Sequence, residues 1–191
     1  MDESTEQKEE FKEEAFSQNN LDKLDGQTCP MCSKNTLTLM QYETDIPFFG
    51  NVFIFSMNCS TCNYKKSDVE PEKTHESCKY TLDIDSEQDM KIRIIRSSSA
   101  TVKIPHMMNI EPGPGAEGYV TNVEGLLMRI KRVLEMEKES EDDTGTQKKI
   151  KNMLKKLQKV IWGQEKLKII IEDPNGNSAI ISDKAVKSKL K

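Results

Sequence analysis

The N-terminal part of the sequence contains two short cysteine motifs, Cys29-Pro30-Met31-Cys32 and Cys59-Ser60-Thr61-Cys62, from which its fold can be inferred. In each motif two residues separate the cysteines, so that one tight turn can present both sulfur atoms to the same ion. Four thiolates at about 2.3 Å complete the tetrahedral coordination of a structural zinc ion. We therefore predict one structural Zn²⁺ with four ligands: Cys29, Cys32, Cys59 and Cys62.

The residues between the two motifs predict a β-hairpin. Residues 36–42 alternate weakly between apolar and polar side chains, 52–55 form a short apolar run, and the stretch 46–51 is typical of a turn. Two strands of matched length return the second cysteine pair to the first. This accounts for a gap that is longer than the roughly 15–20 residues of the common zinc pattern. Asn63 follows the second pair, where a zinc knuckle often requires a positive φ that Asn tolerates.

A single Cys-x-x-Cys motif is also typical of a thioredoxin-like redox site. Two such motifs at the feet of one hairpin disfavour that alternative, and no histidine lies between residues 29 and 62 to complete an open catalytic zinc site. The two histidines of the chain, His75 and His106, are few for a second, catalytic metal site. We therefore predict a protein that is not an enzyme.

Length and composition limit the class of protein. The chain has 191 residues, of which 31% are charged and 35% hydrophobic, and no apolar run reaches the roughly 18 residues of a membrane span. The opening residues resemble neither a secretory signal nor an Arg-rich transit peptide. Five cysteines, an odd number, disfavour a secreted disulfide framework. We expect a cytoplasmic protein that does not enter a membrane.

The net charge of −4 conceals a polarised chain. Residues 1–28 carry nine acidic residues and three lysines, whereas residues 147–191 carry twelve lysines and four acidic residues. We interpret residues 1–27 as an acidic N-terminal tail. The basic end raises the alternative of a nucleic-acid-binding zinc ribbon in transcription or translation, in which the lysines of 148–159 bind phosphates and Trp162 or Tyr64 stacks on bases. Those lysines, however, share their segment with an apolar stripe and include no arginine, which favours an ordinary solvated helix face.

The second half of the sequence predicts a mainly β domain. Strand patterns occupy three segments, after which a stretch rich in Gly and Pro is too irregular for a strand or helix. The strands are 79–84, 90–96 and 100–104, and the irregular stretch is 111–118. Near the end of the chain, residues 167–171 and 178–182 flank a turn at 173–177 and predict a β-hairpin.

Two amphipathic helices interrupt this β pattern. The first begins at a capping box formed by Thr121 and Glu124, and the second ends near Gly163. A short acidic loop joins them, so they form a helical hairpin. The expected domains are a zinc ribbon at 28–70 and a β domain at 71–191 that carries the helical hairpin at about 122–162.

Several stretches together resemble the ZPR-type zinc-finger proteins. They are Thr44-Asp45-Ile46-Pro47-Phe48-Phe49, Asn58-Cys59-Ser60-Thr61-Cys62, Val123-Glu124-Gly125-Leu126-Leu127 and Asp173-Pro174-Asn175-Gly176-Asn177-Ser178. The resemblance implies a four-cysteine zinc ribbon followed by a β-barrel of the double-stranded β-helix type with a helical hairpin inserted. Members of the family are described as binding translation elongation factor one-alpha, a GTPase, and as assisting its folding. Asn63 stands where the family often has Gly, and His106 where it often has Glu.

We accordingly predict a zinc-binding protein-interaction module, an adaptor or folding chaperone for translation elongation factor one-alpha or another GTPase. The candidate partner-binding residues lie in two places, the tip of the predicted ribbon hairpin and the turn at 173–177: Asp45, Ile46, Phe48 and Phe49 in the first, and Asp173 and Asn177 in the second. At the tip the alternative is that the apolar side chains pack on the β domain. At the turn the alternative is ordinary turn chemistry.

Overall fold

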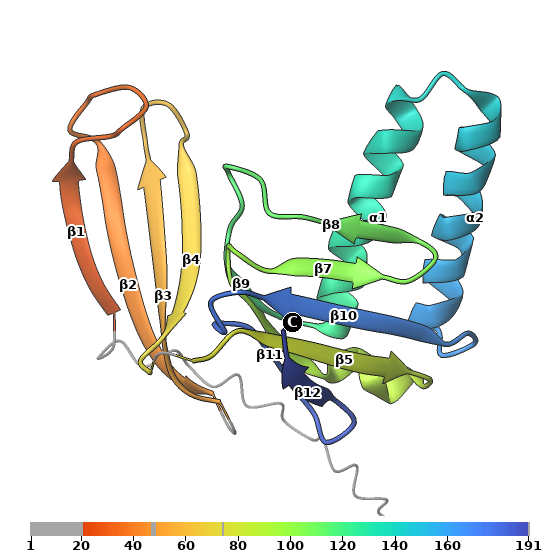
Figure 1. Ribbon diagram of the computed structural model, residues 1–191. Coiled ribbons are helices and arrows are strands. Elements are labelled where there is room, and N and C mark those ends of the chain that lie inside the picture. Colours follow the sequence, from red (N-terminus) through yellow and green to blue (C-terminus); the bar gives the residue numbers. More distant parts are fainter. Residues whose placement is uncertain (1–20, 47–48, 74, 191) are drawn as a thin grey trace, which may run out of the picture.

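The structure is a computed structural model that describes residues 21–46, 49–73 and 75–190. It consists of an N-terminal ribbon sheet and a larger β domain from which two helices project (Figure 1). The expected mainly β fold with a helical insert is therefore confirmed. None of the helices in the described ranges is long and apolar enough to cross a membrane.

The ribbon sheet has four antiparallel strands in the order β1-β2-β3-β4. They are β1 (Leu21–Gln27), β2 (Leu37–Ile46), β3 (Gly50–Cys59) and β4 (Lys65–Pro71). Strands β2 and β3 are the predicted hairpin, paired without interruption from Leu37 opposite Cys59 to Ile46 opposite Gly50. At about 3.4 Å per residue, this pairing places the cysteine end about 30 Å from the hairpin tip.

The expected acidic tail at 1–27 does not extend to residue 27. Residues 21–27 form β1, the edge strand that pairs with β2, whereas residues 1–20 lie outside the described residues. All seven side chains of β1 are exposed, so the strand shows no buried face from which an alternating pattern could be recognised. The ribbon sheet therefore begins seven residues before the predicted domain boundary.

The β domain is built from two sheets. The larger has the order β12-β5-β10-β7-β8, and the smaller has the order β11-β6-β9. In chain order these elements, with one 3-10 helix, are β5 (Cys78–Ile84), η2 (Glu87–Lys91), β6 (Arg93–Arg96), β7 (Thr101–Ile104), β8 (Met108–Ile110), β9 (Tyr119–Asn122), β10 (Leu167–Asp173), β11 (Ala179–Ile181) and β12 (Val186–Lys189).

The predicted C-terminal β-hairpin is wrong, because its two strands belong to different sheets. Strand β10 pairs with β5 on one side and with β7 on the other, whereas β11 pairs with β6. Both edges of β10 are thus occupied, and no edge is left for β11. The turn at 173–178 carries the chain from the larger sheet to the smaller one.

The helical hairpin is confirmed as α1 (Val123–Ser140) and α2 (Thr144–Ile161). Its first cap lies one residue later than predicted, because the side chain of Asn122 accepts a hydrogen bond from the Gly125 amide at 2.8 Å. Asp143 caps α2 in the same way through the Thr146 amide at 2.6 Å. Gly163 ends the hairpin with a φ of +67°, a conformation that glycine adopts without strain.

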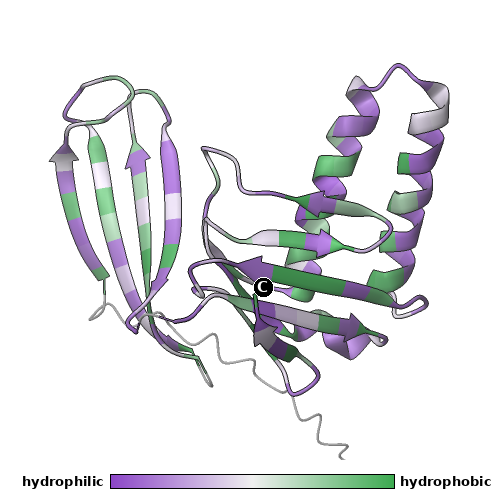
Figure 2. Cartoon of the chain, viewed as in Figure 1, coloured by the Kyte–Doolittle hydropathy of each residue, from purple (hydrophilic) through white to green (hydrophobic). Residues whose placement is uncertain are grey.

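One large hydrophobic core unites the β domain, the inner faces of both helices and the tip end of the ribbon sheet. Figure 2 shows the run of hydrophobic residues along β10 and the hydrophilic outer faces of the helices. The ribbon contributes three buried side chains to this core: Ile46, Val52 and Val69. A second, small cluster lies at the cysteine end of the ribbon around Cys29, Leu37 and Cys59. The tip end of the ribbon therefore shares a hydrophobic core with the β domain, whereas its cysteine end has a cluster of its own.

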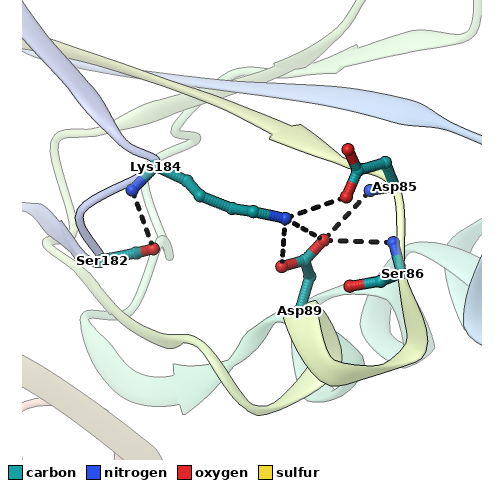
Figure 3. Close-up of polar contacts among 5 residues, drawn as sticks. All are labelled: Asp85, Ser86, Asp89, Ser182 and Lys184. Atoms are coloured by element: carbon teal, nitrogen blue, oxygen red, sulfur yellow. Dashed lines mark hydrogen bonds and ion pairs between the residues drawn. The ribbon is translucent and has the colours of Figure 1, made fainter.

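A buried carboxylate fixes the loop before β12 to the rest of the β domain (Figure 3). Asp89 in η2 is 5% exposed, and its oxygens lie 2.8 and 2.9 Å from Nζ of Lys184. The same carboxylate accepts hydrogen bonds from the amides of Asp85 at 3.0 Å and Ser86 at 3.1 Å. Burial alone would raise the pKa of Asp89, but Lys184 and these donors outweigh burial and hold it at about 2.

Candidate metal centre and partner surface

Two similar turns present the four cysteines. In the first, the Ser33 amide donates to the Cys29 carbonyl at 2.8 Å, and in the second the Asn63 amide donates to the Cys59 carbonyl at 3.0 Å. Ser33 and Asn63 have φ angles of 59° and 57°. The positive φ expected at Asn63 is confirmed, whereas its counterpart at Ser33 was not predicted, because serine gives no signal for that conformation.

The four sulfur atoms fit a tetrahedral zinc ion. All four lie within 4.8 Å of one another, and the Sγ atoms of Cys29 and Cys62, like those of Cys32 and Cys59, are 3.7 Å apart. Zinc–sulfur bonds of about 2.3 Å give a tetrahedron with edges of about 3.8 Å. Four thiolates leave no open coordination position, so the site is structural rather than catalytic.

Thr36 supports this centre from the start of the hairpin. Its hydroxyl lies 3.3 Å from Cys59 Sγ and 2.9 Å from the Thr61 hydroxyl. The hydrogen bond from Thr36, together with the amides of Cys62 and Thr61, outweighs burial and lowers the pKa of Cys59 to about 6. At Cys62 the Tyr64 amide lowers the pKa, but burial and the three neighbouring thiols outweigh it and raise the pKa to about 12. The four thiols therefore differ in how readily they lose their protons. Zinc binding must displace the proton of every thiol that is still protonated.

The comparisons with known proteins match both parts of the chain. Residues 24–77 match the model of the ZPR1 zinc-finger domain, and residues 88–191 match that of the ZPR1 jelly-roll domain. A ZPR1-like protein of Methanocaldococcus jannaschii is 40% identical over 166 residues, which cover 86% of this chain and 82% of that protein. The chain belongs to the ZPR1 family.

Two further ZPR1 relatives differ in how much of their own length this chain covers. A ZPR1-like protein of Pyrococcus horikoshii is 40% identical over 85% of this chain and 75% of its own length. The zinc finger chaperone zpr1 of Schizosaccharomyces pombe is 30% identical over 80% of this chain, which corresponds to only 33% of that protein. The predicted zinc ribbon followed by a β-barrel with a helical insert is thus confirmed as a ZPR1 zinc finger and jelly roll.

Two of the predicted partner-binding residues are buried, and a third lies outside the described residues. Ile46 is 2% exposed and packs in the large core, which favours the alternative that the tip packs on the β domain. Phe48 lies outside the described residues. Asp173 is fully buried. The burial of Ile46 and Asp173 corrects the expectation that they face a partner, since residue type alone does not reveal burial between distant segments. Phe48 stays a prediction.

Asp173 is instead the centre of a buried hydrogen-bond network. Its carboxylate accepts hydrogen bonds from three hydroxyl groups, those of Ser178 at 2.6 Å, Ser97 at 2.7 Å and Ser99 at 3.0 Å. It also accepts a hydrogen bond from the backbone amide of Asn175 at 2.9 Å. Asp173 therefore holds the turn at 173–178 against the loop before β7, and its role is to position the turn.

The other predicted residues come together on one surface. A cavity of about 270 Å³ is lined by Asp45 and Phe49 of the hairpin tip together with Lys73 and His75. A second cavity, of about 440 Å³, is lined by Lys73, His75 and the turn residues Asn175 and Asn177. The two cavities thus meet at the segment between β4 and β5. We call this region the junction surface and define it by six residues: Asp45, Phe49, Lys73, His75, Asn175 and Asn177.

Local packing fixes the parts of the junction surface to one another. The rings of Phe49 and His75 lie with their centroids 5.4 Å apart and tilted by 32°. Gly176, with a φ of +71°, packs so closely that a Cβ there would collide with the Glu76 carbonyl. Burial, and then the charges of Lys187 and Lys73, lower the pKa of His75, so its ring is neutral at pH 7. No local pattern in the sequence connects His75 with the hairpin tip or with the turn at 173–178.

Proposed function

We propose that this chain is a cytoplasmic, zinc-stabilised adaptor or folding chaperone for the GTPase translation elongation factor one-alpha, and that it binds its partner through the junction surface. The observation that carries the proposal is the convergence of two sequence-distant segments. The hairpin tip supplies Asp45 and Phe49, the turn at 173–178 supplies Asn175 and Asn177, and both border the same cavities. The relative named a zinc finger chaperone supports a folding role.

The chemistry of the junction surface suits a protein partner. Amide side chains at Asn175 and Asn177 offer both donors and acceptors, and Lys73 and Asp45 offer one charge of each sign. The half-buried Phe49 and His75 supply a ring-lined floor. A small apolar centre within a polar rim is typical of protein interfaces that assemble and separate.

Zinc supports this surface indirectly. The metal centre and the hairpin tip lie at opposite ends of β2 and β3, about 30 Å apart, and Figure 1 shows the cysteine-bearing turns at the end of the ribbon sheet away from the tip. We therefore propose that zinc holds the strands that carry the tip and does not touch the partner at the junction surface. Partner binding then depends on zinc only through the order of the hairpin.

The test is calorimetric titration of archaeal elongation factor one-alpha, in GDP and in GTP, with the zinc-loaded chain. The test variant is Asp45→Ala/Lys73→Ala/Asn177→Ala. The matched control is Asn58→Ala/Lys91→Ala/Asp142→Ala, which removes the same side-chain types at exposed positions elsewhere. Loss of two or three contacts at an interface centre corresponds to a drop in affinity of roughly 10-fold or more.

The control variant is expected to keep its affinity within about twofold. Equal affinity of the test variant and the parent would refute the junction surface as the binding site. Absence of binding by the parent, with one zinc per chain verified, would refute the elongation factor as the partner.

A further inference from the structure

The outer face of α2 carries a row of lysines, one for each helical turn. Successive members are three or four residues apart and therefore lie on one side of the helix. All four are exposed: Lys148, Lys151, Lys155 and Lys159. The opposite face of α2 buries Ile150, Leu157 and Val160 in the core. Packing therefore fixes which side of the helix the lysine row occupies.

No acidic side chain within α2 neutralises this row, because the helix contains six lysines and neither aspartate nor glutamate. Among the ion pairs of the described residues, only one involves a lysine of α2, that of Lys156 with Glu165 at 3.8 Å. Like charges at three- and four-residue spacing repel one another and destabilise the helix. The face thus maintains a local positive field on a chain whose net charge is −4.

The lysine row ends at an exposed aromatic side chain. Trp162 follows Lys159 by three residues and thus continues the same face, and it is 59% exposed. It is the only tryptophan of the chain. A large flat ring left in water contributes little to the core, whereas it can stack on a ligand of its own shape. This is a second feature, independent of charge, on the same side of α2.

We propose that the lysine row and Trp162 bind single-stranded RNA along α2. The lysines contact successive phosphates, and the indole stacks on an unpaired base. This combination of a positive track and an aromatic platform is how proteins bind single strands without sequence preference. A duplex offers no free base face to Trp162. An acidic protein segment would use the lysines but has no need of the indole, so RNA accounts for more of the surface.

This surface lies on the helical hairpin and shares no residue with the junction surface. RNA binding therefore stands or falls independently of the proposed elongation-factor partner. The single tryptophan also makes the experiment direct, because all indole fluorescence comes from the proposed site.

The experiment titrates the zinc-loaded full chain with a 12-nucleotide oligouridylate and follows Trp162 fluorescence. Stacking is expected to quench the indole. If four lysines contact phosphates, the slope of log K against log salt is about −3, so that affinity falls roughly 50-fold between 50 and 200 mM salt. No quenching at 50 mM salt would overturn the proposal. Quenching by polyglutamate but not by the oligonucleotide would also overturn it, in favour of an acidic protein segment.

Two matched variants locate the site. Lys148→Gln/Lys151→Gln/Lys155→Gln/Lys159→Gln keeps good helix formers at exposed positions and is expected to abolish the salt-dependent binding, as measured with a fluorescent oligonucleotide. The control removes four exposed lysines elsewhere: Lys34→Gln/Lys65→Gln/Lys66→Gln/Lys91→Gln. Equal loss in both variants, or loss in the control alone, would overturn the assignment to α2.

Trp162 is tested separately with the same fluorescent oligonucleotide. Trp162→Leu is expected to weaken binding by roughly 5- to 150-fold, the range for loss of one stacked base, and to leave the salt slope unchanged. Unchanged affinity would overturn the stacking role. Circular dichroism of each variant verifies that α2 remains helical.

Discussion

Replacement of Asp89 by Asn tests whether the buried carboxylate beside Lys184 stabilises the β domain as its geometry indicates. The pKa of Asp89 is held at about 2 in the folded protein, against about 3.9 for an aspartate in an unfolded chain. A difference of nearly two pH units corresponds to about 2–3 kcal/mol of folding free energy at neutral pH. For a chain of this length, that loss lowers the melting temperature by roughly 4–12 °C.

The pH dependence of this effect has a fixed sign. Because the folded-state pKa is lowered, the carboxylate contributes its full stabilisation above pH 4, and this contribution disappears as the pH falls from about 4 to 2. The assay is urea unfolding of the parent and of Asp89→Asn across this range. Loss of zinc in acid affects both proteins alike and does not change the difference between them. The difference should be about 2–3 kcal/mol at pH 7 and below about 1 kcal/mol at pH 2.

The control for this measurement is Asp83→Asn. Asp83 pairs with Lys168 at 3.3 Å, but its side chain is 71% exposed, so the free energy of unfolding should change by less than about 1 kcal/mol. If Asp89→Asn lowers the free energy of unfolding by no more than this control at pH 7, the carboxylate of Asp89 does not stabilise the β domain. A loss that persists unchanged at pH 2 would contradict the electrostatic cause.

Three further predictions concern the zinc centre and the core. Removal of zinc with a chelator should unfold the cysteine end of the ribbon and also lower the melting temperature of the β domain, because the ribbon contributes Ile46 to the shared core; an unchanged melting curve would contradict this. Ile46→Ala should lower the free energy of unfolding by about 2–5 kcal/mol in urea titrations, whereas a change below about 1 kcal/mol would place Ile46 at the surface. Asp173→Ala should cost about 3 kcal/mol or more, because it leaves buried hydroxyl donors without an acceptor; a stable variant that had lost only partner binding would identify Asp173 as a contact instead.

The zinc centre was predictable from the sequence because its information is local. Cysteine spacing specifies how each turn presents two sulfur atoms. In the second of these turns, Asn63 indicates the position that adopts a positive φ. The helical hairpin was predictable for a similar reason, since periodic apolar residues report the buried faces of α1 and α2 directly.

The predictions were wrong where strand pairing and burial depend on contacts between distant segments of the chain. Strands β10 and β11 flank a good turn sequence, but β10 pairs with β5 and β7 across long sequence separations. Ile46 and Asp173 have the residue types of a hairpin tip and a surface turn, yet both are buried by segments far away in the chain. The meeting of Asn177 with Lys73 and His75 depends on the same long-range packing, which no local pattern reports.

The most direct test of the proposed function is the refolding yield of elongation factor one-alpha. The denatured factor is diluted into buffer with the zinc-loaded chain, with the Asp45→Ala/Lys73→Ala/Asn177→Ala variant, or with neither, and recovered nucleotide binding is measured. A higher yield with the parent chain, and no gain with the variant, is the predicted result. A yield that is the same in all three reactions would contradict a folding role for this chain.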